Sequence, residues 1–286
     1  METIGEAKLW TFLSGRTFAA RGATCSQVRH SNGFEVSDYL DLARRVAELQ
    51  FLNRDYVLLF RGQSQDYKND KGNSTLKPSL FRQIGGQNPN SAQLLDRFQA
   101  LSEAERILTQ EYEMRGFMGR DRLIRQRVLR WSILQHYEVC KTPVLDVSQS
   151  LRIAASFAST DATPAAFVFV LGVPNISGAI TASAEAGVQI VRLASVCPPL
   201  AVRPHIQEGY LLGEYPEMTG YDQKQHYSHF EIDLGRRLIA KFRFNPSTFW
   251  KRGDFSRVRP AALYPNESDP VFAAAEAVRH RIVHVE

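Results

Sequence analysis

The sequence predicts an α+β fold: a single compact domain in which a helical N-terminal half packs on a mostly antiparallel sheet. Long amphipathic patterns dominate the first half of the 286 residues, and short apolar runs dominate the second half. The two kinds of pattern do not alternate as regular βαβ units, and no internal repeat, long linker or low-complexity segment divides the chain. We expect an N-terminal extension over residues 1–35 and one domain over residues 36–286.

The helices are indicated by apolar residues that recur every three or four positions. Residues 36–50 place Tyr39, Leu40, Val46 and Leu49 near one face, with Ser37 as a plausible N-cap. The remaining helical patterns cover residues 91–116, 121–138 and 150–159, and a last helix begins at about residue 270.

The strands are indicated by short apolar runs bounded by turn residues. These runs cover residues 56–61, 142–148, 165–173, 188–194 and 237–244. A polar loop rich in glycine, asparagine and lysine follows the first run and lasts until Leu76.

The composition is that of an ordinary globular protein, with 44% hydrophobic and 23% charged residues. The formal net charge is +5, from 35 basic and 30 acidic residues. This mildly basic balance favours an anionic small molecule or nucleic acid without requiring either. An arginine-rich run at 119–131 is typical of a helix with a solvated basic face.

Several classes of site are excluded by the sequence. Cys25, Cys140 and Cys197 are isolated, so we expect neither a disulfide framework nor a structural zinc site, and no other metal site. We expect no signal peptide, because the apolar run near the N-terminus is short and interrupted, and no run reaches the roughly 18 apolar residues of a membrane span. We therefore expect a cytoplasmic protein that does not bind membranes.

The common nucleotide and hydrolase motifs are absent: there is no P-loop, no dinucleotide-binding glycine motif and no nucleophile elbow. Four polar clusters remain. In the first, Arg61-Gly62-Gln63 ends an apolar run; arginine suits phosphate or carboxylate, and glycine admits a ligand or another backbone. An ion pair between Arg61 and a buried carboxylate is the alternative. In the second cluster, residues 75–82, Lys77 and Arg82 flank a Pro-Ser turn that could bind an anion. The alternative is a loop held by Leu76, Leu80 and Phe81.

The third cluster surrounds the predicted strand at 142–148. His136 and Tyr137 end a helix before it, and Asp146, Ser148 and Ser150 lie where the strand meets the next helix. A serine here could serve as an N-cap, and the same helix terminus could bind an anion.

The fourth cluster is Gln207-Glu208-Gly209. Its carboxylate could act as a general base or orient a ribose hydroxyl, and a surface glutamate is the alternative.

Together these motifs resemble the FRG domain family, which is named for its Phe-Arg-Gly motif. The resemblance extends from about residue 36 to about residue 270. The matching elements, in chain order, are Phe60-Arg61-Gly62 with Gln63, LKPSL at 76–80, His136-Tyr137, Leu145-Asp146, AASFA at 154–158, Gln207-Glu208-Gly209 and LYPNESDP at 263–270. The family occurs mainly in bacterial and phage proteins, which implies a toxin or antiviral defence role by association.

This chain departs from the family pattern after the His-Tyr pair. Glu138 replaces the usual glycine, Val144 replaces the usual arginine, and Val147-Ser148 replaces Trp-Thr. Loss of that arginine removes any ligand contact that it makes in other members. Ser148 retains the hydroxyl group of the usual threonine.

A weaker resemblance to ADP-ribosyltransferase-like folds implies NAD as a substrate. It implies that Arg61 contacts an NAD phosphate and that Ser148 or Ser150 supports the nicotinamide-binding strand. Glu208 or Gln207 would orient the ribose and the attacking group. His136 and Tyr137 would contact the nicotinamide ribose. The implied catalytic residues are Glu208, Gln207 and His136, and the implied binding residues are Arg61, Gly62, Gln63, Tyr137, Asp146, Ser148 and Ser150.

Three functions follow as hypotheses. The first is an NAD-utilising enzyme, either an ADP-ribosyltransferase or an NAD glycohydrolase, because a carboxylate can stabilise the oxocarbenium ion formed when nicotinamide leaves. The second is a non-catalytic module that binds a nucleotide or a protein partner. The third is a protein that acts on nucleic acid, for which the basic pI of about 9.1 is the main support.

Overall fold

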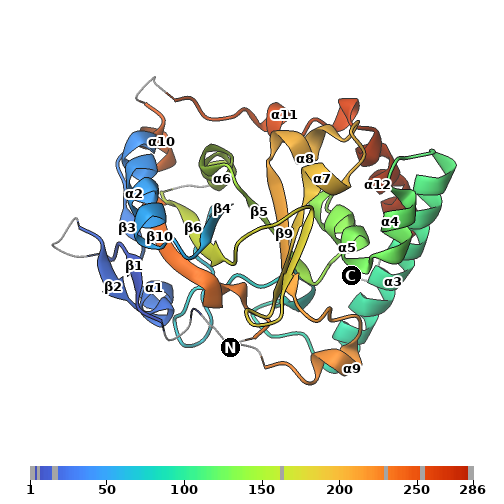
Figure 1. Cartoon of the computed structure of the whole chain (residues 1–286), viewed down its shortest axis with the longest axis horizontal. Helices are drawn as coiled ribbons and strands as arrows, with labels where there is room; N and C mark the ends of the chain where they lie inside the picture. The colour runs from blue at the N-terminus through green and yellow to red at the C-terminus, as the bar shows by residue number, and fades with distance from the viewer. Residues whose placement is uncertain are drawn as a thin grey trace. The chain divides into compact units, whose positions relative to one another are not determined.

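The computed structural model describes residues 4, 7–14, 19–161, 164–228, 231–251 and 255–282 (Figure 1). The internal contacts divide the chain into two compact units, each built from three segments. Unit 1 comprises Met1–Leu76, Val147–Ile176 and Asp233–Leu263; unit 2 comprises Lys77–Asp146, Ser177–Ile232 and Tyr264–Glu286. The chain therefore alternates between the two units.

The strands of unit 1 form a sheet in the order β3-β10-β6-β4-β5 and a separate β1-β2 pair. All neighbours are antiparallel except β3 and β10, which are parallel. The central strand β6 is completely buried from Val168 to Leu171, which explains its continuous apolar run. The strands are β1 (Leu9–Thr11), β2 (Arg21–Ala23), β3 (Phe34–Glu35), β4 (Val57–Gln63), β5 (Val144–Ser148), β6 (Ala166–Val173) and β10 (Leu238–Phe244). Of β5, only Val147 and Ser148 belong to unit 1, and Val144–Asp146 belong to unit 2.

Among the helices of unit 1, α6 packs against β4 and β6 (Figure 1). Helix α2 begins at Tyr39, and its N-cap is Asp38, which accepts a hydrogen bond from the Asp41 amide, so the prediction of Ser37 as N-cap is wrong. The helices are α1 (Cys25–His30), α2 (Tyr39–Leu52), α6 (Leu151–Ala158), the 3-10 turn η2 (Leu234–Arg237), α10 (Pro246–Phe249) and α11 (Pro260–Leu263).

Unit 2 contains an antiparallel run of strands in the order β9-β8-β7 and most of the long helices. Helix α3 packs against α4, α5 and α12 (Figure 1). The elements are the 3-10 turn η1 (Ser79–Phe81), α3 (Ser91–Met114), α4 (Arg120–Arg125), α5 (Arg127–His136), β7 (Ile180–Ser183), β8 (Val188–Arg192), α7 (Leu193–Val196), α8 (Val202–Ile206), β9 (Gly209–Glu214), α9 (Tyr221–Lys224), the 3-10 turn η3 (Asn266–Ser268) and α12 (Pro270–Arg281).

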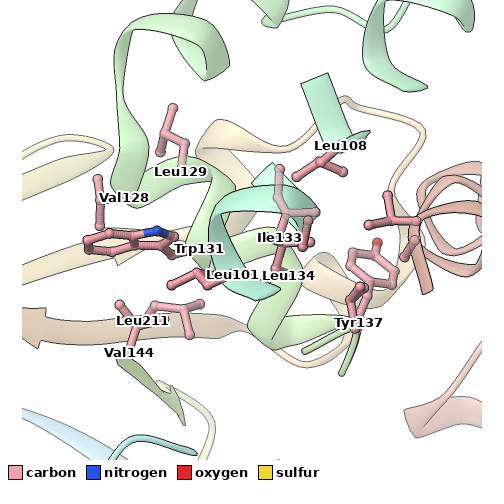
Figure 2. Close-up of a cluster of buried hydrophobic side chains, with 14 of the residues drawn as sticks. Leu101, Leu108, Val128, Leu129, Trp131, Ile133, Leu134, Tyr137, Val144 and Leu211 are labelled. Atoms are coloured by element: carbon pink, nitrogen blue, oxygen red, sulfur yellow. The ribbon is translucent and has the colours of Figure 1, made fainter. Parts of the chain in front are cut away.

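The core of unit 2 is a cluster of buried apolar side chains around α5 (Figure 2). Trp131, Leu134 and Tyr137 lie in it with no more than 1% of their surface exposed. Leu108 of α3 and Leu211 of β9 belong to the same cluster. Helix α5 is therefore buried along most of its length, and its C-terminal end packs into the apolar cluster through Leu134 and Tyr137.

The predicted α+β class and its mostly antiparallel pairing are confirmed. The predicted helix at 121–138 is interrupted, because Gln126 is extended and separates α4 from α5. The Arg130 guanidinium supplies a reason: it donates hydrogen bonds to the carbonyls of Leu123 and Ile124, at 2.6 and 2.8 Å. These bonds satisfy carbonyls that a helix leaves free where it ends.

The predicted N-terminal extension contains β1, β2, α1 and β3, which all belong to unit 1. The boundary at residue 36 stays a prediction. In the described part of the chain, no helix has the length and apolarity that crossing a membrane requires.

Candidate functional site

The predicted site residues divide between the two units. Unit 1 holds Arg61, Gly62, Gln63, Ser148 and Ser150, and unit 2 holds His136, Tyr137, Asp146, Gln207 and Glu208.

Arg61, Gly62 and Gln63 are the last residues of β4, where the strand becomes half-buried. Gly62 is required by the approach of α6: a Cβ at this position would lie 1.8 Å from the Ala154 carbonyl oxygen and 2.8 Å from the Ala158 amide nitrogen. Because both atoms are backbone, neither can rotate away. The glycine therefore admits another backbone, which was one of the two predicted alternatives. The Phe-Arg-Gly and AASFA motifs are thus two sides of one helix–strand contact.

Ser148 and Ser150 make hydrogen bonds to the backbone at the start of α6. Ser150 is the N-cap, and its hydroxyl accepts from the Ile153 amide at 3.5 Å, while the Ser148 hydroxyl accepts from the Ser150 amide at 2.9 Å. The predicted N-cap is confirmed for Ser150. The role of either serine in holding a ligand stays a prediction.

The loop that follows Gln63 is held by a buried lysine that sequence reasoning missed. The Lys241 ammonium of β10 donates to Asp66 Oδ2 at 2.8 Å, to Ser74 Oγ at 2.7 Å and to the backbone oxygens of Arg29 and Ser31. Burial lowers the pKa of Lys241, and the Asp66 carboxylate opposes that change. Alternation in β10 would have suggested an exposed lysine, so nothing local indicates this contact.

In unit 2, His136 at the C-terminal end of α5 pairs with Asp146 of β5. His136 is 3% exposed, and its Nδ1 lies 3.2 Å from Asp146 Oδ1, while the Asp146 side chain is 30% exposed. Nε2 of His136 is buried and has no hydrogen-bond partner in the described part of the chain. A Cβ on Gly209 would lie 3.1 Å from His136 Cε1, so the glycine lets β9 approach the imidazole edge. Residues from two of the polar clusters singled out in the sequence therefore meet at one histidine.

The chemistry of this pair follows from the carboxylate. An ionised Asp146 can only accept, so it selects the tautomer with a proton on Nδ1 and leaves Nε2 as an acceptor. A carboxylate-oriented imidazole whose Nε2 carries no proton can accept a hydrogen bond from a hydroxyl or N–H group, or act as a general base. Gln207 is buried and Glu208 is exposed, and their predicted roles stay predictions.

Tyr137 is buried and engaged in contacts within unit 2. Its hydroxyl donates to Asp269 Oδ2 at 2.7 Å, and the Arg203 guanidinium lies over its ring at 5.5 Å. Burial raises the pKa of Tyr137 most, and the nearby Cys197 and Asp269 raise it further. Asp269 also accepts from the amides of Arg203 and Val271, at the start of α12. These contacts favour a structural role for Tyr137, and a ligand contact stays a prediction.

Glu138 has a left-handed backbone, with φ of 56°, at the position where the family usually has glycine. This conformation explains the family preference, because only glycine adopts it without strain. The Glu138 carboxylate accepts from Arg203 at 2.8 Å, but its side chain is 63% exposed, so the pair adds little stability.

Replacing Glu138 with glycine is expected to keep or raise the free energy of unfolding, by up to about 1 kcal/mol, because it relieves the left-handed strain. Glu138→Val should lower it by about 1–2 kcal/mol, because a β-branched residue fits this backbone poorly. Chemical denaturation measures both. Glu138→Gln keeps the backbone and removes only the charge, and it separates strain from the Arg203 pair. A loss for the glycine variant larger than for the glutamine variant would contradict the strain argument.

No group of three or more histidine, cysteine, aspartate or glutamate side chains that could hold a metal ion occurs in the described ranges.

Residues 57–166 match the family model described as the FRG domain. The match includes Phe60-Arg61-Gly62, His136-Tyr137 and Asp146, and it ends before Gln207. No curated protein and no solved structure matches the chain.

Proposed function

We propose that this chain, whose residues 57–166 carry an FRG domain, is a binding module for a nucleotide-type ligand that hydrogen-bonds to His136. The observation that carries the proposal is the buried Nε2 atom of His136, which lacks a partner in the described residues. A buried polar atom without a hydrogen-bond partner is unfavourable by about 1–3 kcal/mol. A site that retains such an atom is therefore suited to a ligand that supplies the missing partner.

The ligand class follows from the acceptor character of Nε2. Such an atom calls for a hydroxyl or N–H group, and a ribose hydroxyl meets this requirement. The anionic part of a nucleotide suits the net charge of +5. Two guanidiniums also contact the residues next to His136: Arg279 donates to the Tyr137 and Glu138 carbonyls, and Arg203 bonds to the Glu138 carboxylate.

Cleavage of NAD is the second candidate, and the Asp146–His136 pair favours it because it has the arrangement of a general base and its orienting group. Nε2 would take a proton from water as the water oxygen bonds to the ribose C1′ atom. The C1′–nicotinamide bond would break, and nicotinamide would leave as a neutral molecule. In this version His136 is the general base and Asp146 orients it, and Glu208 is no longer the main catalytic residue. A toxin or defence role stays a prediction.

Binding tests the proposal directly. Titration of the whole chain with ADP-ribose, ATP and NAD should show saturable binding to at least one of them by calorimetry, with a Kd of about 1–100 μM. A long-range proton–nitrogen spectrum should show the His136 Nε2 resonance moving on binding, which loss of structure elsewhere would not produce. His136→Gln should weaken binding at least about tenfold, corresponding to one lost hydrogen bond.

The matched control is His205→Gln, because His205 is exposed and should bind the ligand as the wild type does. If His136→Gln does not fold, Asp146→Asn serves instead, since Asp146 is partly exposed and sets the tautomer. The proposal is wrong if none of the three probes binds below about 1 mM. It is also wrong if one binds without moving the Nε2 resonance. Release of nicotinamide from NAD would establish the second candidate over a simple binding module.

A further inference from the structure

Residues 114–125, the corner between α3 and α4, expose several large apolar side chains. Met114 is 67% exposed, Met118 is 70% exposed and Ile124 is 45% exposed, all within residues 114–125. Two of the four methionines of the chain are thus presented to solvent in one short segment. Neighbouring large apolar side chains in solvent mark interaction sites more often than scattered ones do.

The corner has a defined shape. Phe117 packs edge-on against Tyr112 of α3, with ring centroids 5.0 Å apart, and Leu123 is buried in the core of unit 2. Arg120 pairs with Glu113 at 3.0 Å across the turn. Gly116 and Gly119 adopt left-handed conformations, with φ of 63° and 88°, that reverse the chain. The methionines are therefore held out on a fixed turn.

The arginines in and next to the corner differ in whether they form ion pairs. Arg115 and Arg120 pair with glutamates of α3, and the later Arg127 and Arg130 pair with Glu105. The described part of the chain provides no ion pair for Arg122 or Arg125, and both are exposed. Arginine and methionine are enriched in protein interfaces, while lysine and glutamate are depleted. The corner has that composition, and its four arginines outnumber its one carboxylate, the exposed Asp121.

We propose that residues 114–125 form a docking surface for an acidic segment of a partner protein. The apolar side chains of that segment would cover Met114, Met118 and Ile124, and its carboxylates would pair with Arg122 and Arg125. Nucleic acid is disfavoured, because Phe117 is the one aromatic residue in 114–125 and it packs on the core, which leaves no stacking platform. The proposal is independent of the nucleotide-type ligand, since it uses no residue of that site.

Two fluorescent peptides of about 12 residues test the docking surface by anisotropy, one alternating leucine with glutamate and the other alternating leucine with lysine. The acidic peptide should bind at least about tenfold more tightly than the basic one, and it should weaken between about 50 and 300 mM salt. Arg122→Glu combined with Arg125→Glu should abolish that preference. Met114→Ser combined with Met118→Ser should weaken the acidic peptide at least about fivefold while keeping the preference.

The matched control is Phe51→Ser combined with Arg54→Glu, which removes an exposed phenylalanine and a neighbouring arginine in unit 1. It should bind the acidic peptide as the wild type does. Equal binding of both peptides, or equal binding by wild type and the corner variants, would overturn the proposal. Tighter binding of a DNA duplex or of anionic phosphatidylserine vesicles than of the acidic peptide would overturn it too.

Discussion

Replacing Gly62 with alanine is expected to lower the free energy of unfolding by about 4 kcal/mol or more, or to prevent folding. The added Cβ would lie 1.8 Å from the Ala154 carbonyl oxygen, so β4 and α6 would have to separate. That separation would open a contact lined by Ala154, Ala155 and Ala158, whose small side chains allow the helix to lie close to the sheet. Chemical denaturation followed by circular dichroism measures the loss, without any ligand present.

Gly22→Ala is the matched control for Gly62→Ala. Gly22 is also a strand glycine, but nothing lies within 4 Å of a Cβ placed there, so its substitution should change stability by no more than about 0.5 kcal/mol. If Gly62→Ala folded with nearly wild-type stability, the close approach of α6 would be wrong. The motif glycine would then call for a ligand explanation.

The Gly62 contact shows what sequence patterns can and cannot predict. Local features were predicted well: the apolar run of β4, the serine N-cap of α6 and the amphipathic helix α3 all depend on neighbours in the chain. The reason for Gly62 depends on Ala154, which is far away in sequence. A motif can therefore be identified from the sequence while its physical purpose is not.

The same distinction holds for the candidate site. The sequence placed His136 and Asp146 in one cluster and the Gln-Glu-Gly motif in another. It did not indicate that Gly209 lies against the His136 ring or that Nε2 lacks a partner in the described residues. Lys241 carried no signal at all, since one lysine in a strand pattern resembles an exposed residue. Its buried position follows from a loop that folds back across β10, and only tertiary structure specifies that.

The prediction for the arginine-rich run at 119–131 is wrong for two of its arginines, because their contacts lie far away in the sequence. A solvated basic face was predicted, but Arg127 and Arg130 both bond to the buried Glu105 carboxylate of α3, each with Nε at 2.9 Å. Trp131 donates to the same carboxylate at 2.8 Å. A single glutamate thus joins α3 to α5, and part of the apparent surface charge belongs to the helix packing.

Glu105→Ala is accordingly expected to lower the free energy of unfolding by about 3–5 kcal/mol. The substitution leaves two guanidiniums and an indole N–H without their common acceptor, and the Arg130 side chain is only 15% exposed. Removing one member of a buried charged network costs more than the pair contributes, because the remaining charges stay poorly solvated. Denaturant titration of the whole chain measures the change.

Glu103→Ala provides the matched control, because Glu103 lies on the same helix and also pairs with an arginine. The Glu103 and Arg106 side chains are 47% and 55% exposed, so water solvates either charge when the other is removed, and the expected change is within about 0.5 kcal/mol. Both substitutions replace glutamate with alanine inside α3, so helix propensity contributes equally to each. The difference between them isolates burial. Equal effects would mean that the Glu105 network is as weak as a surface pair, and that α5 is held by its apolar face alone.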